Sequence, residues 1–176
     1  MDKKHLREVK WQQRRVFPDS LKALYDQKIL ERLKPILSDY KNISTYVSIK
    51  DEINTRLLIS WLLDNNKTVC IPNTKNKLMT MNVYEPENSM TTKMGLIESR
   101  NSTEIIPDVV VVPLIAFNNK GYRIGYGGGY YDRYLANKHV LKVGLAYSWM
   151  LEEFKEDDFD VRMDIIVTEN ENHTFT

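Results

Sequence analysis

The sequence predicts an α/β fold: a single domain over residues 1–176 in which a mainly parallel β-sheet is flanked by helices on both faces. A strand–helix–strand pattern runs through residues 42–71, as expected of two parallel strands joined by a crossover helix. The four consecutive valines at 109–112 are typical of a strand covered on both faces. A chain of 176 residues also suits one domain that buries most of its apolar surface.

Two helices are predicted at the start of the chain, over residues 2–16 and about 20–34. Leucines recur at roughly helical spacing through the second segment, at positions 21, 24, 30, 33 and 37. Pro18 separates the two helices, and Asp19 or Ser20 is the expected N-cap of the second. The chain therefore opens with a helical pair.

The pattern changes after Pro35. Residues 42–49 are β-branched and aromatic and predict a strand, residues 53–66 predict a helix, and residues 67–71 predict a second strand. Residues 72–108 are polar and irregular, so we expect an exposed excursion there that contains one strand, at 78–83.

The valine-rich segment 108–113 is the expected centre of the sheet. A glycine-rich loop follows it, and the later pattern predicts a short helix at 130–138 and strands at 141–147 and 164–168. Open α/β sheets bind ligands beyond the carboxyl ends of their strands, so the glycine-rich loop lies where a binding site is expected.

The composition excludes several classes of protein. No apolar run reaches the roughly 18–20 residues of a membrane span, and the N-terminus lacks the apolar core of a secretory signal. We therefore expect a cytoplasmic monomer with no membrane partner. The single cysteine, Cys70, lies in the apolar run "TVCIP", where a buried, inert thiol is expected.

The most unusual segment is "GYRIGYGGGYYDRYL", residues 121–135, which holds five of the seven glycines and five of the ten tyrosines. Glycines leave no Cβ between backbone amides and an anion, and a loop that leads directly into a helix is typical of a phosphate site. A flexible turn is the alternative, but bulky Tyr126, Tyr130, Tyr131 and Arg123 disfavour it. Neither the P-loop pattern nor the dinucleotide fingerprint is present, so another kind of phosphate loop is expected.

Two charged residues of this segment fit a nucleotide site. Arg123 offers a bidentate donor to phosphate oxygens, and Asp132, one turn into the predicted helix, offers an oxygen ligand to Mg²⁺. Taken singly, Arg123 could form a surface ion pair and Asp132 could interact with the helix dipole. Together with the loop they predict a nucleotide with a metal.

The segment closely resembles the signature of the 5-formyltetrahydrofolate cyclo-ligase family. The resemblance continues along nearly the whole chain, in "KKHLR", "YVSIKDEINT", "VCIP", "DVVVVPLIAFN", "VGLAY" and "MDIIVTE". It implies an enzyme that uses ATP and Mg²⁺ to convert 5-formyltetrahydrofolate into 5,10-methenyltetrahydrofolate, ADP and phosphate. Its implied partners are these small molecules, with no nucleic acid.

The resemblance also implies roles for individual residues. Arg123 and Tyr131 take part in catalysis, and Asp132 and Asp164 bind magnesium. The implied ATP contacts are Lys3, Arg7, Arg123, Ile124, Gly125, Tyr126, Gly127, Gly128, Gly129, Tyr130 and Tyr131. The implied folate contacts are Val47, Glu52, Tyr126, Gly127, Gly128, Gly129 and Tyr130.

Other interpretations of these residues stay open. Glu52 could cap the following helix, Val47 could belong to the core, and the basic residues near the N-terminus could form a solvated helix face. The chain also departs from the family: Asn118 stands where an Asp is expected, which puts only a loop-shaping role in doubt. Tyr126 and Gly128 occupy places that are basic in some relatives, so phosphate contact there would rest on backbone amides.

The implied chemistry needs no covalent nucleophile. The formyl oxygen is a poor leaving group; phosphorylation by ATP activates it, and N10 of the same substrate then attacks the formyl carbon. The protein has to position the substrates and neutralise charge. Two other functions compete: a nucleic-acid module, disfavoured by the net charge of +1, and a sugar-phosphate or CoA enzyme, which leaves Asp132 unexplained.

Overall fold

The structure, a computed structural model, describes residues 2–176. Within this range, no helix has the length and apolar character needed to cross a bilayer. The α-helices are α1 (Lys3–Val16), α2 (Asp19–Leu37), α3 (Arg56–Asp64) and α4 (Tyr130–Leu135). The strands are β1 (Asn42–Thr45), β2 (Thr68–Lys75), β3 (Leu78–Val83), β4 (Ser89–Thr91), β5 (Ile97–Ser99), β6 (Val109–Val112), β7 (Ala116–Phe117), β8 (Arg123–Ile124), β9 (Leu141–Leu145), β10 (Ile165–Val167) and β11 (Asn172–Thr174).

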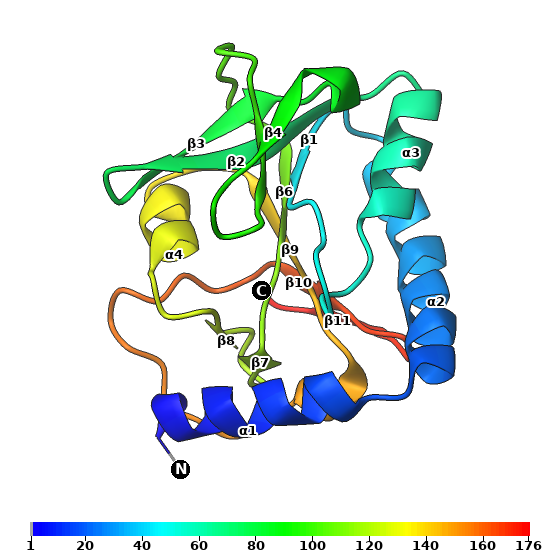
Figure 1. Ribbon diagram of the computed structural model, residues 1–176. Helices are drawn as coiled ribbons and strands as arrows, with labels where there is room; N and C mark the ends of the chain where they lie inside the picture. Colours follow the sequence, from blue (N-terminus) through cyan, green and yellow to red (C-terminus); the bar gives the residue numbers. More distant parts are fainter. Residues whose placement is uncertain (1) are drawn as a thin grey trace.

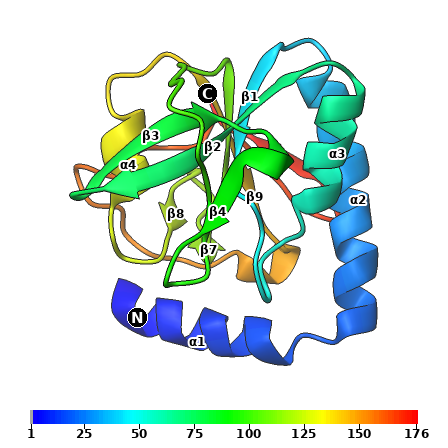
Figure 2. The ribbon, with the colours of Figure 1, turned by 45° about the horizontal axis from the view of Figure 1, so that its top comes forward.

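Seven strands form the central sheet, in the order β11-β10-β9-β6-β1-β2-β3. The five inner strands are parallel, and the edge strands β11 and β3 are antiparallel to their neighbours. Helices α2 and α3 cover one face and α4 covers the other, while α1 runs past one end of the sheet (Figures 1 and 2). The predicted fold class is therefore confirmed.

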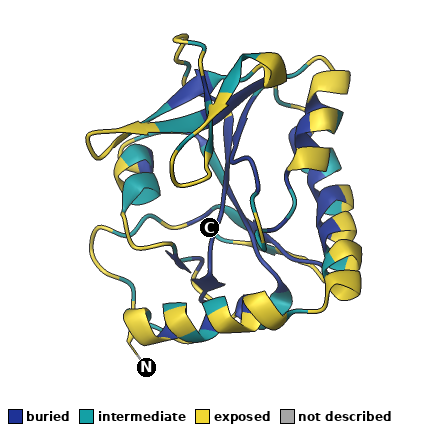
Figure 3. Cartoon of the chain, in the orientation of Figure 1, coloured by how far each residue is buried: buried dark blue, intermediate teal, exposed yellow. Residues whose placement is uncertain are grey.

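The predicted centre of the sheet is also confirmed. β6 is the fourth of the seven strands, and its four valines are 0% exposed. Burying one such side chain contributes roughly 1.5–3 kcal/mol, so this strand anchors the core. Figure 3 shows the contrast with α1, which is largely exposed, whereas the central strand β6 is buried.

The second helix is longer than predicted. α2 begins at Asp19 and continues through Pro35 to Leu37, and its N-cap is Pro18, so the expected Asp19 or Ser20 cap is wrong. Pro35 lies in the last turn, where a lost backbone hydrogen bond disturbs little of the helix. Leu37 is fully buried, and this packing favours the extra turn.

The first strand is shorter than predicted, because β1 ends at Thr45 rather than at residue 49. Residues 46–49 leave the sheet at its carboxyl end while their side chains stay mostly buried. Sequence reasoning also missed β11, the β4–β5 hairpin, and the pairing of β7 with β8 at the start of the glycine-rich segment. These elements have two or three residues each, too few to show a periodic pattern.

Cys70 is buried as predicted, and it gives a first testable expectation. Its thiol is 0% exposed, and burial raises its pKa to about 12. The thiol of the unfolded chain has a pKa of about 8.5. Burial of the neutral Cys70 thiol therefore favours the native state fully below about pH 8.5, and this stabilisation is lost as the pH rises toward 12.

Ellman's reagent should fail to label native protein at pH 8 and should label it after denaturation. Denaturant titrations at pH 8 and pH 10 should show a smaller fall in stability for Cys70→Val than for the parent; rapid native labelling would contradict the burial.

Candidate active site

The strand order places a crevice between β1 and β6. From this central pair, the β1–α3–β2 connection leads toward one edge of the sheet, and the β6–α4–β9 connection leads toward the other. Ligands of open α/β sheets bind where the connections diverge in this way, outside the carboxyl ends of the strands. The crevice is narrow, and no water-sized sphere fits between its lining residues, which are Arg14, Tyr46, Glu52, Ile53, Pro113, Leu114, Tyr126 and Leu145.

A short hairpin leads into the glycine-rich loop, and Asn118 shapes its turn. The Asn118 Oδ1 atom accepts hydrogen bonds from the amides of Lys120 (3.1 Å) and Tyr122 (3.0 Å). Its Nδ2 atom donates to the Phe154 carbonyl at 3.2 Å. The amide oxygen of Asn118 therefore accepts the hydrogen bonds that a carboxylate oxygen of Asp could accept at this position. The Nδ2 atom adds a donor that links the turn to the segment around Phe154.

The glycines of the loop are required for different reasons. Gly127 and Gly129 have φ angles of 103° and 69°, in the left-handed region that side chains rarely adopt. A Cβ at Gly125 would lie 2.5 Å from Nη1 of Arg123. The loop thus keeps its shape through backbone freedom at two positions and keeps room for a guanidinium at a third.

Arg123 lies at the centre of the predicted nucleotide site. It is 7% exposed, its Cζ atom lies 5.4 Å from the centroid of the Tyr131 ring, and its Nη2 atom lies 3.8 Å from Oδ1 of Asp132. Burial lowers its pKa, and the Asp132 carboxylate opposes that shift. Within residues 2–176 its buried Nε has no hydrogen-bond partner. A buried donor of this kind is costly unless a ligand satisfies it.

Tyr131 is the second residue predicted to be catalytic, and the structure brings it against Arg123. Burial raises the pKa of its phenol, and the nearby guanidinium of Arg123 acts in the opposite direction. Asp132, on the same helix, accepts a hydrogen bond from the Val161 amide at 3.1 Å through Oδ1. The three residues Arg123, Tyr131 and Asp132 therefore form one cluster.

Helix α1 brings basic side chains to the loop. Arg7 donates from Nε to the Gly125 carbonyl at 2.8 Å. Lys3, the other predicted ATP contact, forms ion pairs with Asp157 (2.8 Å) and Asp160. Burial lowers the pKa of Lys3, but its hydrogen bonds to these two carboxylates outweigh that effect and leave the pKa raised. Arg7 is thus at the loop, whereas Lys3 contacts the acidic segment beside it.

Two basic residues of α1 were missed by sequence reasoning. Lys10 is 4% exposed and donates to the Trp149 carbonyl at 2.8 Å, and Arg14 is 6% exposed and donates to the Tyr126 hydroxyl at 3.1 Å. With Lys3 and Arg7 they have the spacing i, i+4, i+7 and i+11, which is one helix face. That spacing was a usable signal: these four basic residues form an inner face of α1 that is buried at Lys10 and Arg14 and partly buried at Lys3 and Arg7, whereas Lys4 and Arg15 are exposed.

Glu52 and Tyr126 join the two loops that border the crevice. Glu52 accepts hydrogen bonds from the Ile49 amide through Oε1 and from the Tyr126 hydroxyl through Oε2, both at 2.9 Å. Burial raises the pKa of Tyr126, and the Glu52 carboxylate raises it further, so the phenol stays protonated as a donor at neutral pH. The alternative role of Glu52 as a helix cap is wrong, because Oδ1 of Asn54 accepts from the first amide of α3 at 2.8 Å.

The sequence model of the 5-formyltetrahydrofolate cyclo-ligase family matches residues 1–169. The chain belongs to this family. The 5-formyltetrahydrofolate cyclo-ligase of Mycoplasma genitalium is 34% identical over 176 residues, covering 95% of this chain and 98% of the relative. The protein of that name from Haemophilus influenzae is 38% identical over 142 residues, covering 72% of this chain and 75% of the relative.

Solved structures agree with this family membership. The 5,10-methenyltetrahydrofolate synthetase of Aquifex aeolicus superposes with a TM-score of 0.89 at 28% identity, over 99% of this chain and 93% of that one. The 5,10-methenyltetrahydrofolate synthetase of Mycoplasma pneumoniae superposes with a TM-score of 0.77 at 29% identity, over 96% of this chain and 99% of that one. The family resemblance of the glycine-rich segment is thereby confirmed across the whole fold.

Several residues that the family resemblance implies as ligand contacts lie around the cluster of Arg123, Tyr131 and Asp132. None of them makes a contact that tests the implied role. Val47 is 8% exposed and packs in the core where the chain leaves β1, and Ile124 is 2% exposed beside Arg123. The Tyr130 ring lies 5.1 Å from Cζ of Arg133. Their ligand contacts stay predictions.

The two predicted magnesium ligands differ in their surroundings. Asp164 immediately precedes β10, and its Oδ2 accepts from the Lys142 amide at 2.8 Å, with Nζ of Lys142 at 3.7 Å. It belongs to the segment whose Val161 amide contacts Asp132. Across the described part of the chain, no three His, Cys, Asp or Glu side chains form a metal-binding group. The protein alone thus offers single carboxylates rather than a complete metal cage.

Proposed function

We propose that this chain is a 5-formyltetrahydrofolate cyclo-ligase that uses MgATP and releases 5,10-methenyltetrahydrofolate, ADP and phosphate. The observation that carries the proposal is the buried Arg123 beside the glycine loop, with a free Nε donor and the Asp132 carboxylate 3.8 Å from Nη2. ATP, when bound with Mg²⁺, supplies the phosphoryl group that activates the formyl oxygen. The protein residues position the two substrates and balance their charge.

The nucleotide end of the proposed site lies between α1 and α4. Arg123 would donate to phosphate oxygens, and Gly127, Gly128 and Gly129 carry no Cβ of their own that would keep an anion from the loop amides. Arg7 holds the loop carbonyl at Gly125, which keeps the guanidinium of Arg7 within reach of the same anion. Preorganised donors in a water-poor site stabilise developing negative charge strongly.

Asp132 fits the role of magnesium ligand in the proposed complex. Its Oδ1 atom accepts a hydrogen bond from the Val161 amide, which fixes the carboxylate, and its Oδ2 atom would bind the cation. In nucleotide sites Mg²⁺ is commonly held by one or two carboxylates together with phosphates and water, so a complete protein cage is not required. Asp164 remains the second candidate, although its Oδ2 atom already accepts from Lys142.

The folate end of the proposed site lies at Glu52 and Tyr126. Their hydrogen bond places a carboxylate and a phenol ring at the crevice, where the carboxylate could accept from pterin N–H groups and the ring could pack on its face. Trp11 packs edge-on against Tyr126, with the ring centroids 6.1 Å apart, and limits the movement of that ring. N5 and N10 of the substrate would then lie between Glu52 and the loop.

The test is to mix the purified chain with 5-formyltetrahydrofolate and MgATP and to record the near-ultraviolet absorbance of the methenyl product. We expect the signal to require both ATP and Mg²⁺. Asp132→Asn should lower kcat by about 100-fold and raise the Mg²⁺ concentration needed for half-maximal rate. Asp19→Asn is a matched control, because Asp19 and Asp132 are both first-turn helix carboxylates. Folded parent protein that gives no product at saturating substrate would refute the proposed function.

A further inference from the structure

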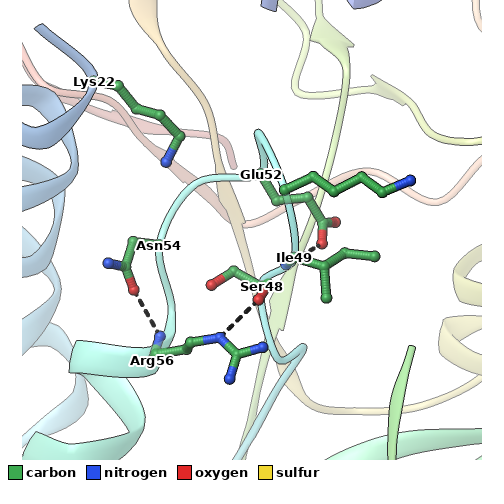
Figure 4. A pocket seen from close by; sticks show the side chains of 7 residues that line it. Lys22, Ser48, Ile49, Glu52, Asn54 and Arg56 are labelled. Carbon is green, nitrogen blue, oxygen red and sulfur yellow. Dashed lines mark hydrogen bonds between the residues drawn. The ribbon is translucent and has the colours of Figure 1, made fainter. Parts of the chain in front are cut away.

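Two loops border the crevice, and the proposed site assigns one substrate to each. The loop that joins β1 to α3, residues 46–55, carries Glu52, and the glycine-rich loop carries Tyr126. The first loop has a fixed shape of its own, since Arg56 at its end donates from Nε to the Ser48 carbonyl at 2.9 Å (Figure 4). The proposed substrates can therefore react only when these two loops are held in one relative position.

Arg14 of α1 contacts both loops at once. Its guanidinium is buried, and Nη1 donates to the Tyr126 hydroxyl of the glycine-rich loop at 3.1 Å. On the other side, Nε donates to Oδ1 of Asp51 at 3.2 Å, and Nη2 lies 3.1 Å from the same oxygen. A planar guanidinium offers donors in several fixed directions, whereas the ammonium of a lysine is a single point charge. Arg14 is thus suited to hold two partners on different segments.

The link through Arg14 does not depend on Glu52. Glu52 also accepts a hydrogen bond from Tyr126, but its carboxylate is the proposed pterin contact, so a bound substrate competes for it. Arg14 pairs instead with Asp51, the preceding residue, whose side chain is 26% exposed. The two loops therefore stay connected through Arg14 when Glu52 is engaged by a substrate.

We propose that Arg14 is a positioning residue that couples the folate end of the site to the nucleotide end. The inference rests on the proposed function, since it assigns Glu52 to the folate and the glycine-rich loop to ATP. A ligand that orders one loop also fixes Arg14, and a fixed Arg14 lowers the entropic cost of ordering the other loop. Each substrate therefore binds more tightly when the other is bound, and linkage requires both affinities to change by the same factor.

The test measures, by calorimetry, the Kd of 5-formyltetrahydrofolate with and without saturating Mg²⁺ and AMP-PNP, an ATP analogue that resists transfer of its γ-phosphoryl group. We expect AMP-PNP to tighten folate binding by about five- to tenfold in the parent and by less than about twofold in Arg14→Met. For Arg14→Lys, which keeps the charge without the fork, the factor should lie between these values. Arg15→Met is the matched control, because Arg15 is exposed and lies over the Trp11 ring; it should keep the parent factor.

Asp51→Ala breaks the same link from its other end. It changes a partly exposed side chain and leaves α1 intact, so it should fold, and we expect it to reduce the factor to less than about threefold. Limited proteolysis of the ligand-free variants then tests the two loops separately. Arg14→Met should speed tryptic cleavage after Lys50 and chymotryptic cleavage after Tyr126 together, while cleavage after Lys77 on the β2–β3 hairpin stays at the parent rate.

Faster cleavage in only one loop, or an undiminished factor in Arg14→Met, would overturn the inference. A purely structural role would weaken the binding of each ligand alone and leave the factor at its parent value. A parent that forms product but binds the two ligands independently refutes the coupling and leaves the proposed function in place. A parent that shows the coupling but forms no product refutes the function alone, and a parent that binds neither ligand refutes both.

Discussion

Arg123→Met is expected to lower kcat/KM for ATP by about 100- to 1,000-fold, because it removes a preorganised cation from the proposed site of phosphoryl transfer. The free energy of unfolding should change by less than about 1 kcal/mol. Removing one partner of an ion pair destabilises a protein when the other charge is left buried and unpaired, but Asp132 is 18% exposed and keeps its hydrogen bond from the Val161 amide, and the Arg123–Asp132 pair is long, at 3.8 Å. Enzyme kinetics and denaturant titration of one preparation measure both quantities.

Arg133→Met is the matched control for Arg123→Met. Both guanidinium groups lie over a neighbouring tyrosine ring, Arg133 over Tyr130 at 5.1 Å and Arg123 over Tyr131 at 5.4 Å. Arg133 donates to the Gly128 carbonyl and is exposed, so we expect a loss of less than about tenfold. Equal losses of kcat/KM in the two variants would mean that Arg123 acts only by packing against the Tyr131 ring. Arg123→Lys keeps the positive charge but lacks the forked donor of a guanidinium, so its kcat/KM should lie between those of Arg123→Met and the parent.

Gly125→Ala is expected to lower kcat/KM for ATP by about 30- to 100-fold without unfolding the protein. Gly125 does not have a positive φ, so the backbone accepts alanine, but the new Cβ would lie 2.5 Å from Nη1 of Arg123. The guanidinium must then move away from its place beside the loop. The double variant Gly125→Ala/Arg123→Met tests the cause, since it should be no less active than Arg123→Met alone.

Gly95→Ala is the control for Gly125→Ala, because it is expected to change the stability of the protein and not its kinetic constants. Gly95 has a φ of 83° and no atom within 4 Å of a built Cβ. Alanine there should lower stability by about 1 kcal/mol through backbone strain and leave the kinetic constants unchanged. Full activity of Gly125→Ala, or additive losses in its double variant with Arg123→Met, would contradict the proposed steric mechanism.

The fold was predictable from sequence because its signals are local. Four adjacent valines mark the buried centre of the sheet, and the leucine spacing of α2 marks a face on which Leu30, Leu33 and Leu37 are buried, although Leu21 and Leu24 are exposed. The end of β1 was not predictable, because residues 46–49 are mostly apolar and mostly buried after they leave the sheet. What ends the strand is the loss of a neighbouring backbone, and a single-strand pattern contains no information about its neighbours.

The site was predictable where its residues are adjacent in sequence. Arg123, Tyr131 and Asp132 lie within ten positions, and one motif contained them all. Arg14 and Tyr126 are 112 positions apart, and no local pattern pairs them. Glu52 was identified by the family resemblance alone, since its contact with Tyr126 spans 74 positions. Long-range polar contacts therefore mark the limit of what the motif revealed.

Helix α1 is attached to the rest of the protein largely through charge. Leu6 is its buried apolar residue, while Lys3, Lys10 and Arg14 form ion pairs with carboxylates of other segments. Dissolved ions screen exposed pairs more than buried ones. Lys3 pairs with both Asp157, which is 53% exposed, and Asp160, which is 6% exposed, so we expect rising ionic strength to weaken the Lys3–Asp157 contact and to leave the more buried pairs largely intact. In the proposed enzyme, this exposed contact at the amino end of α1 is therefore the place where salt concentration would first affect the helix that carries Arg7 to the glycine loop.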